Sequence, residues 1–318
     1  MTVDVLLAAY NGENYIRAQL DSLICQTYKD IRILVSDDCS TDSTAHIINE
    51  YAEKYDNIHY FKTEKNLGYA GNFGSLLRRV EAPFYMLCDQ DDVWEPGKIG
   101  LSMDYLLKND ADLVYTDLAV VDGGLNTIHP SMIDFSKTRV YQNKFTDYRL
   151  VYLRNYVTGC TVLAKSKFIE KILPVPEEFP MVHDWWIVLM TGQTGKICFL
   201  DTVTVKYRQH GDNQIGVYQR PDQSFDEYRD YYTGLRVSQF KIYVKNEARF
   251  ESEELRTLNR KAVLYFEKIR NKRLCNFRNY GIFFGVYKYE IPGRKLKRFM
   301  LLNFPVFGRF LFRLGRRK

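Results

Sequence analysis

The first 115 residues alternate between short apolar runs and segments whose apolar residues recur every three or four positions. The apolar runs have the length of β-strands, and a polar or glycine-containing break follows each of them. They cover residues 3–9, 31–35, 58–61, 84–87 and 113–115. The segments between them have the period of an amphipathic helix. Strands and helices that alternate in this way form βαβ units, so we predict an α/β fold with a doubly wound, mostly parallel sheet flanked by helices.

The pattern becomes irregular after residue 117, and three more strands are predicted before the chain turns helical. These strands cover residues 156–164, 196–200 and 203–207. An apolar helix starts near His183, and from about Asp222 the sequence predicts helices rich in Tyr, Arg and Lys. We therefore expect a sheet-containing domain over residues 1–220 and a helical, basic extension over residues 221–318.

Three carboxylates follow the fourth apolar run, within the segment Cys88–Trp94. Asp89, Asp91 and Asp92 thus stand at the C-terminal end of a strand, where open α/β sheets bind their ligands. Carboxylates so close together repel one another unless a cation lies among them, and oxygen ligands suit Mg²⁺ or Mn²⁺. Such an ion would hold a diphosphate. The alternative is a solvated acidic turn that caps the next helix.

Missing motifs narrow the class of function. The sequence has no G-x-G-x-x-G after the first strand and no G-x-x-x-x-G-K-[ST], which disfavours dinucleotide-binding and P-loop proteins. A nucleotidyltransferase would need a basic loop after the first strand, and residues 10–14 contain no Lys or Arg. The six Cys have no C-x-x-C spacing, which indicates free thiols in a reducing compartment. We expect no signal peptide, because residues 1–4 lead directly into the first predicted strand. We also expect no membrane-spanning helix, because no apolar run approaches about 20 residues.

The net charge of +6 is unevenly distributed. Residues 266–318 contain about fifteen Lys and Arg against two acids, which leaves the rest of the chain at about −7 (+6 minus +13). From Arg294 to Arg313, basic residues interleave with bulky apolar ones, as in segments that lie on an anionic membrane. Binding to nucleic acid is an alternative, but no recognition motif is present. Packing on the sheet domain or on a partner subunit is another alternative.

Four stretches give the chain a resemblance to the inverting glycosyltransferases of family 2, which have the GT-A fold. They are Ala8–Gly12, Val35–Asp42, Asp89–Pro96 and His183–Trp186. The resemblance spans about residues 1–215 and looks closest to bacterial rhamnosyltransferase-like members that build cell-surface polysaccharides. It implies a nucleotide-sugar donor that lies across the ends of the strands. The C-terminal third matches no motif that we can name.

The resemblance implies roles for residues at the nucleotide. Ala8 and Tyr10 match positions that flank the nucleobase, and Tyr10 would stack on it. Asp38 matches the carboxylate that accepts a hydrogen bond from a pyrimidine N3–H, which agrees with an ionised Asp being an acceptor. For Asp37 and Asp38, capping of the next helix is the alternative. Asn72 would border the donor diphosphate.

Asp89 and Asp91 match the D-x-D element of the family. Asp91 is expected to bind the metal ion directly, and Asp89 to contact the ribose or a metal-bound water. Asp92 would ligate the ion, contact the sugar or brace the loop. His210 follows the last strand and would complete the metal or diphosphate site, although a lone His is more often structural. Gly159 would border the sugar.

Asp184 matches the general base of the family, which takes the proton of the acceptor hydroxyl as attack begins. His183, Trp185 and Trp186 would partly desolvate this carboxylate and raise its pKa. One or both Trp would also form a wall of the acceptor or sugar site. The alternative is that both are core residues on a helix face.

The resemblance implies a metal-dependent inverting transferase, with Mn²⁺ or Mg²⁺ as cofactor, that moves a sugar onto a lipid-linked or growing glycan acceptor. Rhamnose from dTDP-rhamnose is the first expectation, and a hexose from a UDP-sugar is the alternative. A non-catalytic, membrane-associated scaffold is a further alternative, against which the intact Asp91 and Asp184 argue. We expect a cytoplasmic enzyme at the inner face of the cell membrane, without a nucleic-acid partner. The sequence leaves a homo-oligomer open.

Overall fold

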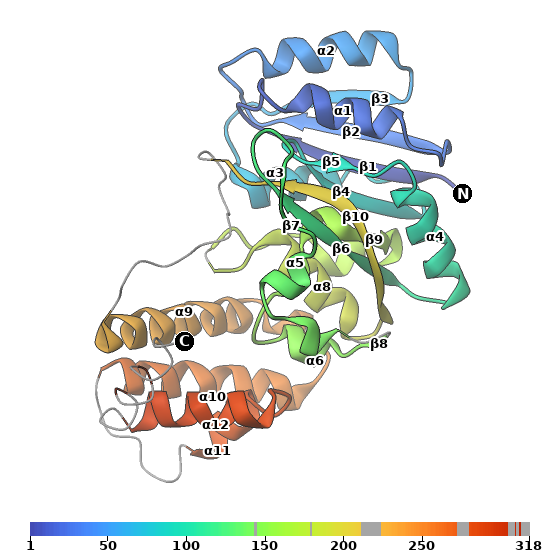
Figure 1. Ribbon diagram of the computed structural model, residues 1–318. Coiled ribbons are helices and arrows are strands. Elements are labelled where there is room, and N and C mark those ends of the chain that lie inside the picture. Colours follow the sequence, from blue (N-terminus) through green and yellow to red (C-terminus); the bar gives the residue numbers. More distant parts are fainter. Residues whose placement is uncertain are drawn as a thin grey trace. The chain divides into compact units, whose positions relative to one another are not determined.

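The computed structural model describes residues 1–142, 145–178, 180–210, 224–271 and 280–304, together with Arg309 and Phe312. These form two compact units (Figure 1), of which the first comprises residues 1–177 and 182–217 and the second residues 178–181 and 218–318. The boundary predicted near residue 220 lies outside the described residues.

The first unit is built on one mixed sheet. Its central strands run in the order β3-β2-β1-β4-β9-β6-β10-β5. Their bounds are β1 Val3–Ala9, β2 Ile31–Asp37, β3 Ile58–Lys62, β4 Phe84–Asp89, β5 Val93–Trp94, β6 Leu113–Val121, β9 Val162–Lys165 and β10 Ile197–Arg208. Two short strands, β7 (Thr127–His129) and β8 (Phe145–Thr146), pair with β6 and β10. Strands β1 to β4 are parallel, whereas β9 is antiparallel to both of its neighbours.

Helices cover both faces of this sheet, which is why the apolar run of β1 is buried almost throughout. Their bounds are α1 Ile16–Ile24, α2 Thr44–Lys54, α3 Gly68–Leu77, α4 Lys98–Lys108, α5 Met132–Phe135, α6 Tyr148–Val151, α7 Ile169–Ile172 and α8 His183–Gly192. Helix α2 packs on β3, α3 on β1 and β2, and α4 on β6 and β10. The predicted α/β fold with a mostly parallel, helix-flanked sheet is confirmed.

Two strand predictions are corrected. The two strands predicted over 196–200 and 203–207 form one continuous strand, β10 (Ile197–Arg208), because the chain keeps pairing with β6 across two register shifts. The strand predicted over 156–164 is shorter, since Gly159–Thr161 form a 3₁₀ turn and only Val162–Lys165 pair with β4 and β6.

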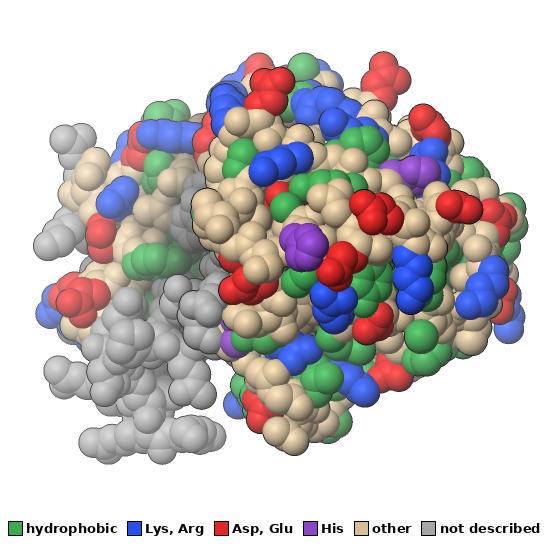
Figure 2. All heavy atoms as spheres, turned by 90° about the horizontal axis from the view of Figure 1, so that it is seen from above, with side chains coloured by type: hydrophobic (Ala, Val, Ile, Leu, Met, Phe, Trp, Pro, Cys, Tyr) green, Lys and Arg blue, Asp and Glu red, His purple; other side chains and the backbone are tan. Residues whose placement is uncertain are grey.

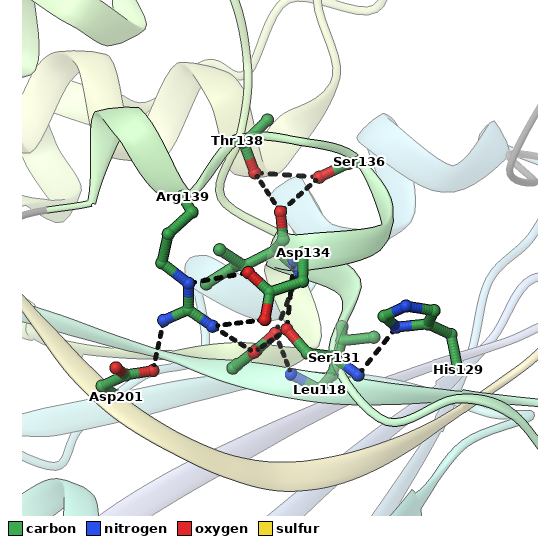
Figure 3. A network of polar contacts seen from close by, with 10 residues as sticks. Leu118, His129, Ser131, Asp134, Ser136, Thr138, Arg139 and Asp201 are labelled. Carbon is green, nitrogen blue, oxygen red and sulfur yellow. Dashed lines mark hydrogen bonds and ion pairs between the residues drawn. The ribbon is translucent and has the colours of Figure 1, made fainter.

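A polar network fixes the segment after β7 to the sheet (Figure 3). The buried Asp117 of β6 accepts a hydrogen bond from Ser131 Oγ at 2.5 Å. Arg139 donates to Asp134 at 2.8 and 3.0 Å and to Asp201 of β10 at 2.7 Å. The segment from β7 to the turn at Arg139 is therefore tied to β6 and β10.

The surface of the first unit that carries α1 and α2 mixes charges of both signs (Figure 2). Arg17 of α1 pairs with Glu50 of α2 at 2.8 Å, and His46 lies 3.3 Å from the same carboxylate. Opposite charges are thus paired at short range on this surface.

The second unit is helical, as predicted. It contains α9 (Phe225–Lys245), α10 (Glu253–Arg270), α11 (Tyr280–Val286) and α12 (Pro292–Asn303). A capping box of Ser224 and Glu227 starts α9. Aromatic side chains fill the interior, among them Phe240, Tyr265, Phe266, Phe283 and Tyr287. In the part of the chain that the structure describes, none of the helices is long and apolar enough to cross a membrane.

Candidate active site

The carboxyl ends of three neighbouring strands meet at one edge of the sheet. Ala8 of β1 is in register with Ser36 of β2 on one side and with Asp89 of β4 on the other. Ala9 is in register with Asp37. The structure thus brings together residues that are about 80 positions apart, in the manner that parallel strands predict.

The loop after β1 is held by Gln90, a residue that sequence reasoning missed. The N–H of Tyr10 donates to Gln90 Oε1, and Gln90 Nε2 donates to the carbonyl of Tyr10, both at 2.8 Å. A Cβ on Gly12 would lie 2.1 Å from Gln90 Oε1, so only glycine leaves room for this amide. The Tyr10 ring itself is 37% exposed at the strand end, as a stacking surface must be. Its contact with a nucleobase stays a prediction.

Asp37 and Asp38 are both buried and both organise loops. Asp37 accepts a hydrogen bond from Ser40 N at 3.0 Å. Asp38 accepts from Leu67 N and Gly68 N at 2.8 Å, which fixes the loop that starts α3. A carboxylate has about four acceptor positions, so these bonds leave capacity for a further donor. The nucleobase contact of Asp38 stays a prediction.

Asn72 of α3 lies beneath the same strand ends. Its Nδ2 donates to the carbonyl of Ser36 at 3.1 Å, and its side chain is 2% exposed. Among the described residues, its Oδ1 has no hydrogen-bond partner. This oxygen is an acceptor and would repel a diphosphate rather than bind it, so the predicted role of Asn72 stays without direct support.

The acidic loop after β4 has the donor set of a cation site. Ligand atoms of Asp89, Asp92 and Cys160 lie within 4.8 Å of one another. Burial and the charges of Asp91 and Asp184 raise the pKa of Asp89 to about 8. Burial likewise raises the pKa of Asp92. A raised pKa means that the ionised form of a carboxylate is disfavoured, and a bound divalent cation stabilises that ionised form. The carboxylates of this loop therefore fit Mg²⁺ or Mn²⁺.

The two predicted metal ligands meet, although 119 positions separate them. His210 Nε2 lies 3.0 Å from Asp91 Oδ2, and both side chains are partly accessible, at 10% and 16%. The His210 ring also packs on Tyr15, with centroids 4.3 Å apart. The structure thus places His210 at the acidic loop, and its role as a ligand stays a prediction.

Asp92 is completely buried and braces the loop. Its Oδ1 accepts a hydrogen bond from Arg208 N at 3.2 Å. Arg208 Nε donates to the carbonyl of Asp91 at 2.8 Å, and its guanidinium lies 4.9 Å from the Tyr15 ring. Of the roles expected for Asp92, the geometry favours bracing over contact with a sugar. Arg208 was missed because its hydrogen bond to the backbone carbonyl of Asp91 leaves no sequence pattern.

A third missed residue, Lys98, lies under this loop. It is fully buried, with Nζ 3.4 Å from Thr204 Oγ1 and 4.6 Å from the Trp94 ring centroid. Burial lowers the pKa of Lys98 to about 8. A cation here opposes the negative charge of Asp92.

Asp184 stands in the first turn of α8 and is held by three N–H donors. Its Oδ1 accepts from Asn155 Nδ2 at 2.9 Å and from Trp185 N at 2.5 Å, and its Oδ2 accepts from Gly159 N at 3.0 Å. Burial raises the pKa of Asp184 to about 6, against these hydrogen bonds. A carboxylate with this pKa is ionised at neutral pH and is still basic enough to take a proton.

Gly159 makes room for the start of α8. A Cβ at this position would lie 3.1 Å from His183 Nε2 and 3.2 Å from Asp184 Cβ. The His183 ring stacks on Phe73 of α3, with centroids 3.9 Å apart, and burial lowers the pKa of His183 to about 3. Gly159 thus lies directly beside the predicted base, and its contact with a sugar stays a prediction.

The two Trp of α8 belong to the core. Trp186 is 0% exposed, and its indole N–H donates to the carbonyl of Ile172 at 2.8 Å. Its predicted place in the sugar site is therefore wrong. Trp185 is 6% exposed, and its N–H donates to the carbonyl of Val151 at 2.6 Å. Its predicted place in the acceptor or sugar site stays a prediction.

A doubly wound sheet with an acidic loop at its strand ends is the arrangement that the resemblance to the GT-A glycosyltransferases implied. Residues 4–172, just over half of the chain, match the family described as Glycosyl transferase family 2. The protein therefore belongs to this family and is a glycosyltransferase (EC 2.4) that uses a nucleotide sugar, as the resemblance implied.

Individual relatives agree with this assignment. The dTDP-rhamnosyl transferase RfbG of Shigella flexneri is 32% identical over 224 residues, which are 66% of this chain and 73% of that protein. The uncharacterized glycosyltransferase RP339 of Rickettsia prowazekii is 28% identical over 237 residues, 73% of this chain and 71% of that protein. The relatives from Rickettsia conorii and Rickettsia felis are longer, and the match covers 34% of their length.

Solved structures share the fold. Staphylococcus aureus TarS, in complex with UDP-GlcNAc, aligns with a TM-score of 0.60 at 18% identity, over 95% of this chain and 82% of that one. The mannosyltransferase PcManGT from Pyrobaculum calidifontis, in complex with GDP-Man and Mn²⁺, aligns with a TM-score of 0.54 at 14% identity, over 90% and 73%. The GT-A fold is thereby confirmed.

Proposed function

We propose that this enzyme transfers a sugar, with inversion, from a nucleoside diphosphate to a hydroxyl group of a glycan acceptor. The observation that carries the proposal is the Asp184 carboxylate, which three N–H donors orient and whose pKa of about 6 suits a general base. It lies close enough to the acidic loop for its charge to raise the pKa of Asp89. A base on one side of the reacting carbon and a diphosphate site on the other is the arrangement that inversion by direct displacement needs.

In this mechanism, Asp184 removes the proton of the acceptor hydroxyl while that oxygen attacks the anomeric carbon. Asn155 and Gly159 keep the carboxylate oriented through their N–H groups. Asp91 and His210 would hold Mn²⁺ or Mg²⁺ at the acidic loop, with Asp89 at the ribose or at a metal-bound water. When bound, the ion supplies positive charge for the departing nucleoside diphosphate.

For the donor, dTDP-rhamnose is the first choice because the Shigella relative at 32% identity is named a dTDP-rhamnosyl transferase. A UDP-hexose is the second choice, since TarS binds UDP-GlcNAc. The acceptor in this proposal is a lipid-linked or growing glycan of a bacterial surface polysaccharide.

A lipid-linked acceptor would require contact with the inner face of the membrane. Three apolar side chains in this region are exposed. They are Phe284 of α11 at 49%, Leu296 of α12 at 63%, and Phe304, the residue directly after α12, at 40%. The Phe284 and Phe304 rings both contact the Phe299 ring, and Lys297 follows Leu296 in the sequence. Aromatic and basic groups in this combination suit an anionic membrane surface.

Transfer can be tested with the purified protein, Mn²⁺ and each of dTDP-rhamnose, UDP-glucose and UDP-galactose. Release of the nucleoside diphosphate is measured with and without a lipid-linked acceptor, and the anomeric configuration of the product is determined by NMR. We expect turnover of one donor, with inversion, and its loss in Asp184→Asn. A product with retained configuration would overturn the mechanism, and a folded protein without any turnover would favour a scaffold.

A further inference from the structure

Tyr69 is a partly buried side chain in the first turn of α3. Within the part of the chain that the structure describes, its hydroxyl group makes no hydrogen bond. The hydroxyl oxygen is nevertheless not one of the buried polar atoms, so it keeps accessible surface. A phenol hydroxyl that is accessible and unbonded can bind a ligand.

Tyr69 lies at the edge of the sheet that carries the candidate site. The N–H of Gly68, the residue before it, donates to Asp38 directly after β2 at 2.8 Å. Phe73, one turn further along α3, stacks on His183 with centroids 3.9 Å apart. The Tyr69 ring lies 6.1 Å from the same His183 ring, one helical turn closer to the strand ends. The start of α3 thus places Tyr69 beside the start of α8.

The neighbour of His183 in α8 is Asp184, the predicted base. Asp184 is partly buried, so it also keeps accessible surface. Burial and the charge of Asp184 raise the pKa of the Tyr69 phenol, which therefore stays protonated at neutral pH. A phenol that keeps its proton is a hydrogen-bond donor. The start of the two helices thus presents a donor next to a carboxylate.

The charges at this place select the kind of ligand. A phenol can also donate to a phosphate, but the Asp184 carboxylate would repel a diphosphate. The predicted cation site at Asp91 and His210 would attract the diphosphate instead. A sugar hydroxyl group is neutral, accepts a hydrogen bond from a phenol and has a proton of its own to donate. It is therefore the ligand group that suits both Tyr69 and Asp184.

We propose that the Tyr69 hydroxyl binds a sugar hydroxyl group beside Asp184 and thereby orients the sugar for transfer. The inference rests on the proposed function, since it needs a sugar at this place. The sugar hydroxyl can belong to the donor or to the acceptor, and the chemistry is the same for both.

The variant Tyr69→Phe tests the proposal, because it keeps the ring and removes only the hydroxyl group. The matched control is Tyr55→Phe. Tyr55 is also partly buried, but it follows α2, and its carbonyl accepts from Ile58 N at the start of β3, at the opposite edge of the sheet. Affinities for dTDP and UDP, and for the corresponding nucleotide sugars, are measured by calorimetry with Mn²⁺. The KM of the acceptor is measured with the preferred donor, and thermal unfolding is followed in parallel.

In Tyr69→Phe we expect the unfolding temperature and the affinity for the nucleoside diphosphate of the wild type. If the bound hydroxyl is on the donor, the nucleotide sugar should bind about 3- to 10-fold more weakly; if it is on the acceptor, the acceptor KM should rise by a similar factor. A deoxy sugar that lacks the bound hydroxyl should show no further loss in the variant. The Tyr55→Phe control should change none of these values.

Two results would overturn the inference while leaving the proposed function intact. One is wild-type affinity for the nucleotide sugar together with a wild-type acceptor KM in Tyr69→Phe. The other is an equal loss of affinity for the nucleoside diphosphate and the nucleotide sugar, which would place the hydroxyl at the diphosphate. Failure of the wild-type protein to bind any nucleotide sugar would instead overturn the proposed function, and this inference with it.

Discussion

Replacement of Asp184 by Asn removes a charge that the fold holds partly out of water. Burial raises the pKa of this carboxyl from 3.8 to about 6. Between about pH 4 and pH 6, the folded state therefore binds more protons than the unfolded state. The free energy of unfolding accordingly falls as the pH rises through this window. The fall is up to about 3 kcal/mol, because one unit of pKa difference is worth about 1.4 kcal/mol.

The hydrogen bonds of Asp184 reduce the gain from Asp184→Asn. Both carboxylate oxygens accept from N–H donors, of Asn155 on one side and Gly159 on the other. The NH₂ of the new amide would face one of these donors. Asn155 cannot turn its own amide around without loss, since its Oδ1 accepts from Val157 N at 3.1 Å. One lost hydrogen bond costs about 1 kcal/mol. We therefore expect Asp184→Asn to be more stable than the wild type by up to about 2 kcal/mol at pH 8 and less stable at pH 4.

Activity should change in the opposite direction. Loss of a general base lowers kcat by about 10²- to 10⁴-fold. In the wild type, kcat/KM should fall as the pH drops below about 6, because the base becomes protonated. The assays are urea unfolding at pH 4, 6 and 8 and sugar transfer over the same range.

A matched control is Asp112→Asn. Asp112 directly precedes the N-terminal end of β6, whereas the candidate site lies at the carboxyl ends of the strands. Burial opposes ionisation of Asp112, but hydrogen bonds from Lys167, Lys196 N and Lys165 lower its pKa, so its stabilising effect is lost as the pH falls. This variant should be destabilised at pH 8 and should transfer sugar normally. If Asp184→Asn differs from the wild type by the same free energy at pH 4 and pH 8, the pKa of Asp184 is not raised and the reasoning fails.

Three further predictions concern the loop, its brace and the helical unit. Gly12→Ala should lower the free energy of unfolding by about 1–2 kcal/mol, since the new Cβ displaces Gln90 and breaks two hydrogen bonds; unchanged urea unfolding would contradict this. Arg208→Met should lower the free energy of unfolding by about 2 kcal/mol and weaken Mn²⁺-dependent nucleotide binding, because the carbonyl of Asp91 loses its hydrogen-bond donor. Urea unfolding and calorimetry measure the two effects, and an unaltered nucleotide affinity would contradict a bracing role. Phe284→Ser combined with Leu296→Ser should reduce sedimentation with phosphatidylglycerol vesicles by at least about fivefold, whereas vesicles of phosphatidylcholine should bind neither form; equal binding of variant and wild type would contradict the membrane proposal.

The sequence allowed prediction of those parts of the site that depend on strand ends. Parallel strands align their carboxyl ends, so Ala8, Asp37 and Asp89 had to meet once the βαβ pattern was recognised. The meeting of Asp91 with His210 rested on the family resemblance, because no local pattern links residues 119 positions apart.

Other features could not be predicted from a pattern. Gln90 and Arg208 act through backbone atoms of distant segments, and such contacts depend on the folded geometry alone. The error at Trp186 has a physical reason: α8 is apolar all round, and such a helix is buried on every side rather than on one face. The strands predicted over 196–200 and 203–207 are one strand, because register shifts in the pairing with β6 let β10 continue between them.

The central claim, a metal-dependent nucleotide-sugar site at the strand ends, is tested most directly by calorimetry with UDP, dTDP, GDP and CDP. Each nucleotide is titrated with Mn²⁺ and with EDTA, into the wild type and Asp91→Ala. We predict binding of dTDP or UDP that needs the metal ion and is lost in Asp91→Ala. Tight binding of GDP would contradict the role given to Asp38, and an absence of any nucleotide binding to the folded protein would contradict the account as a whole.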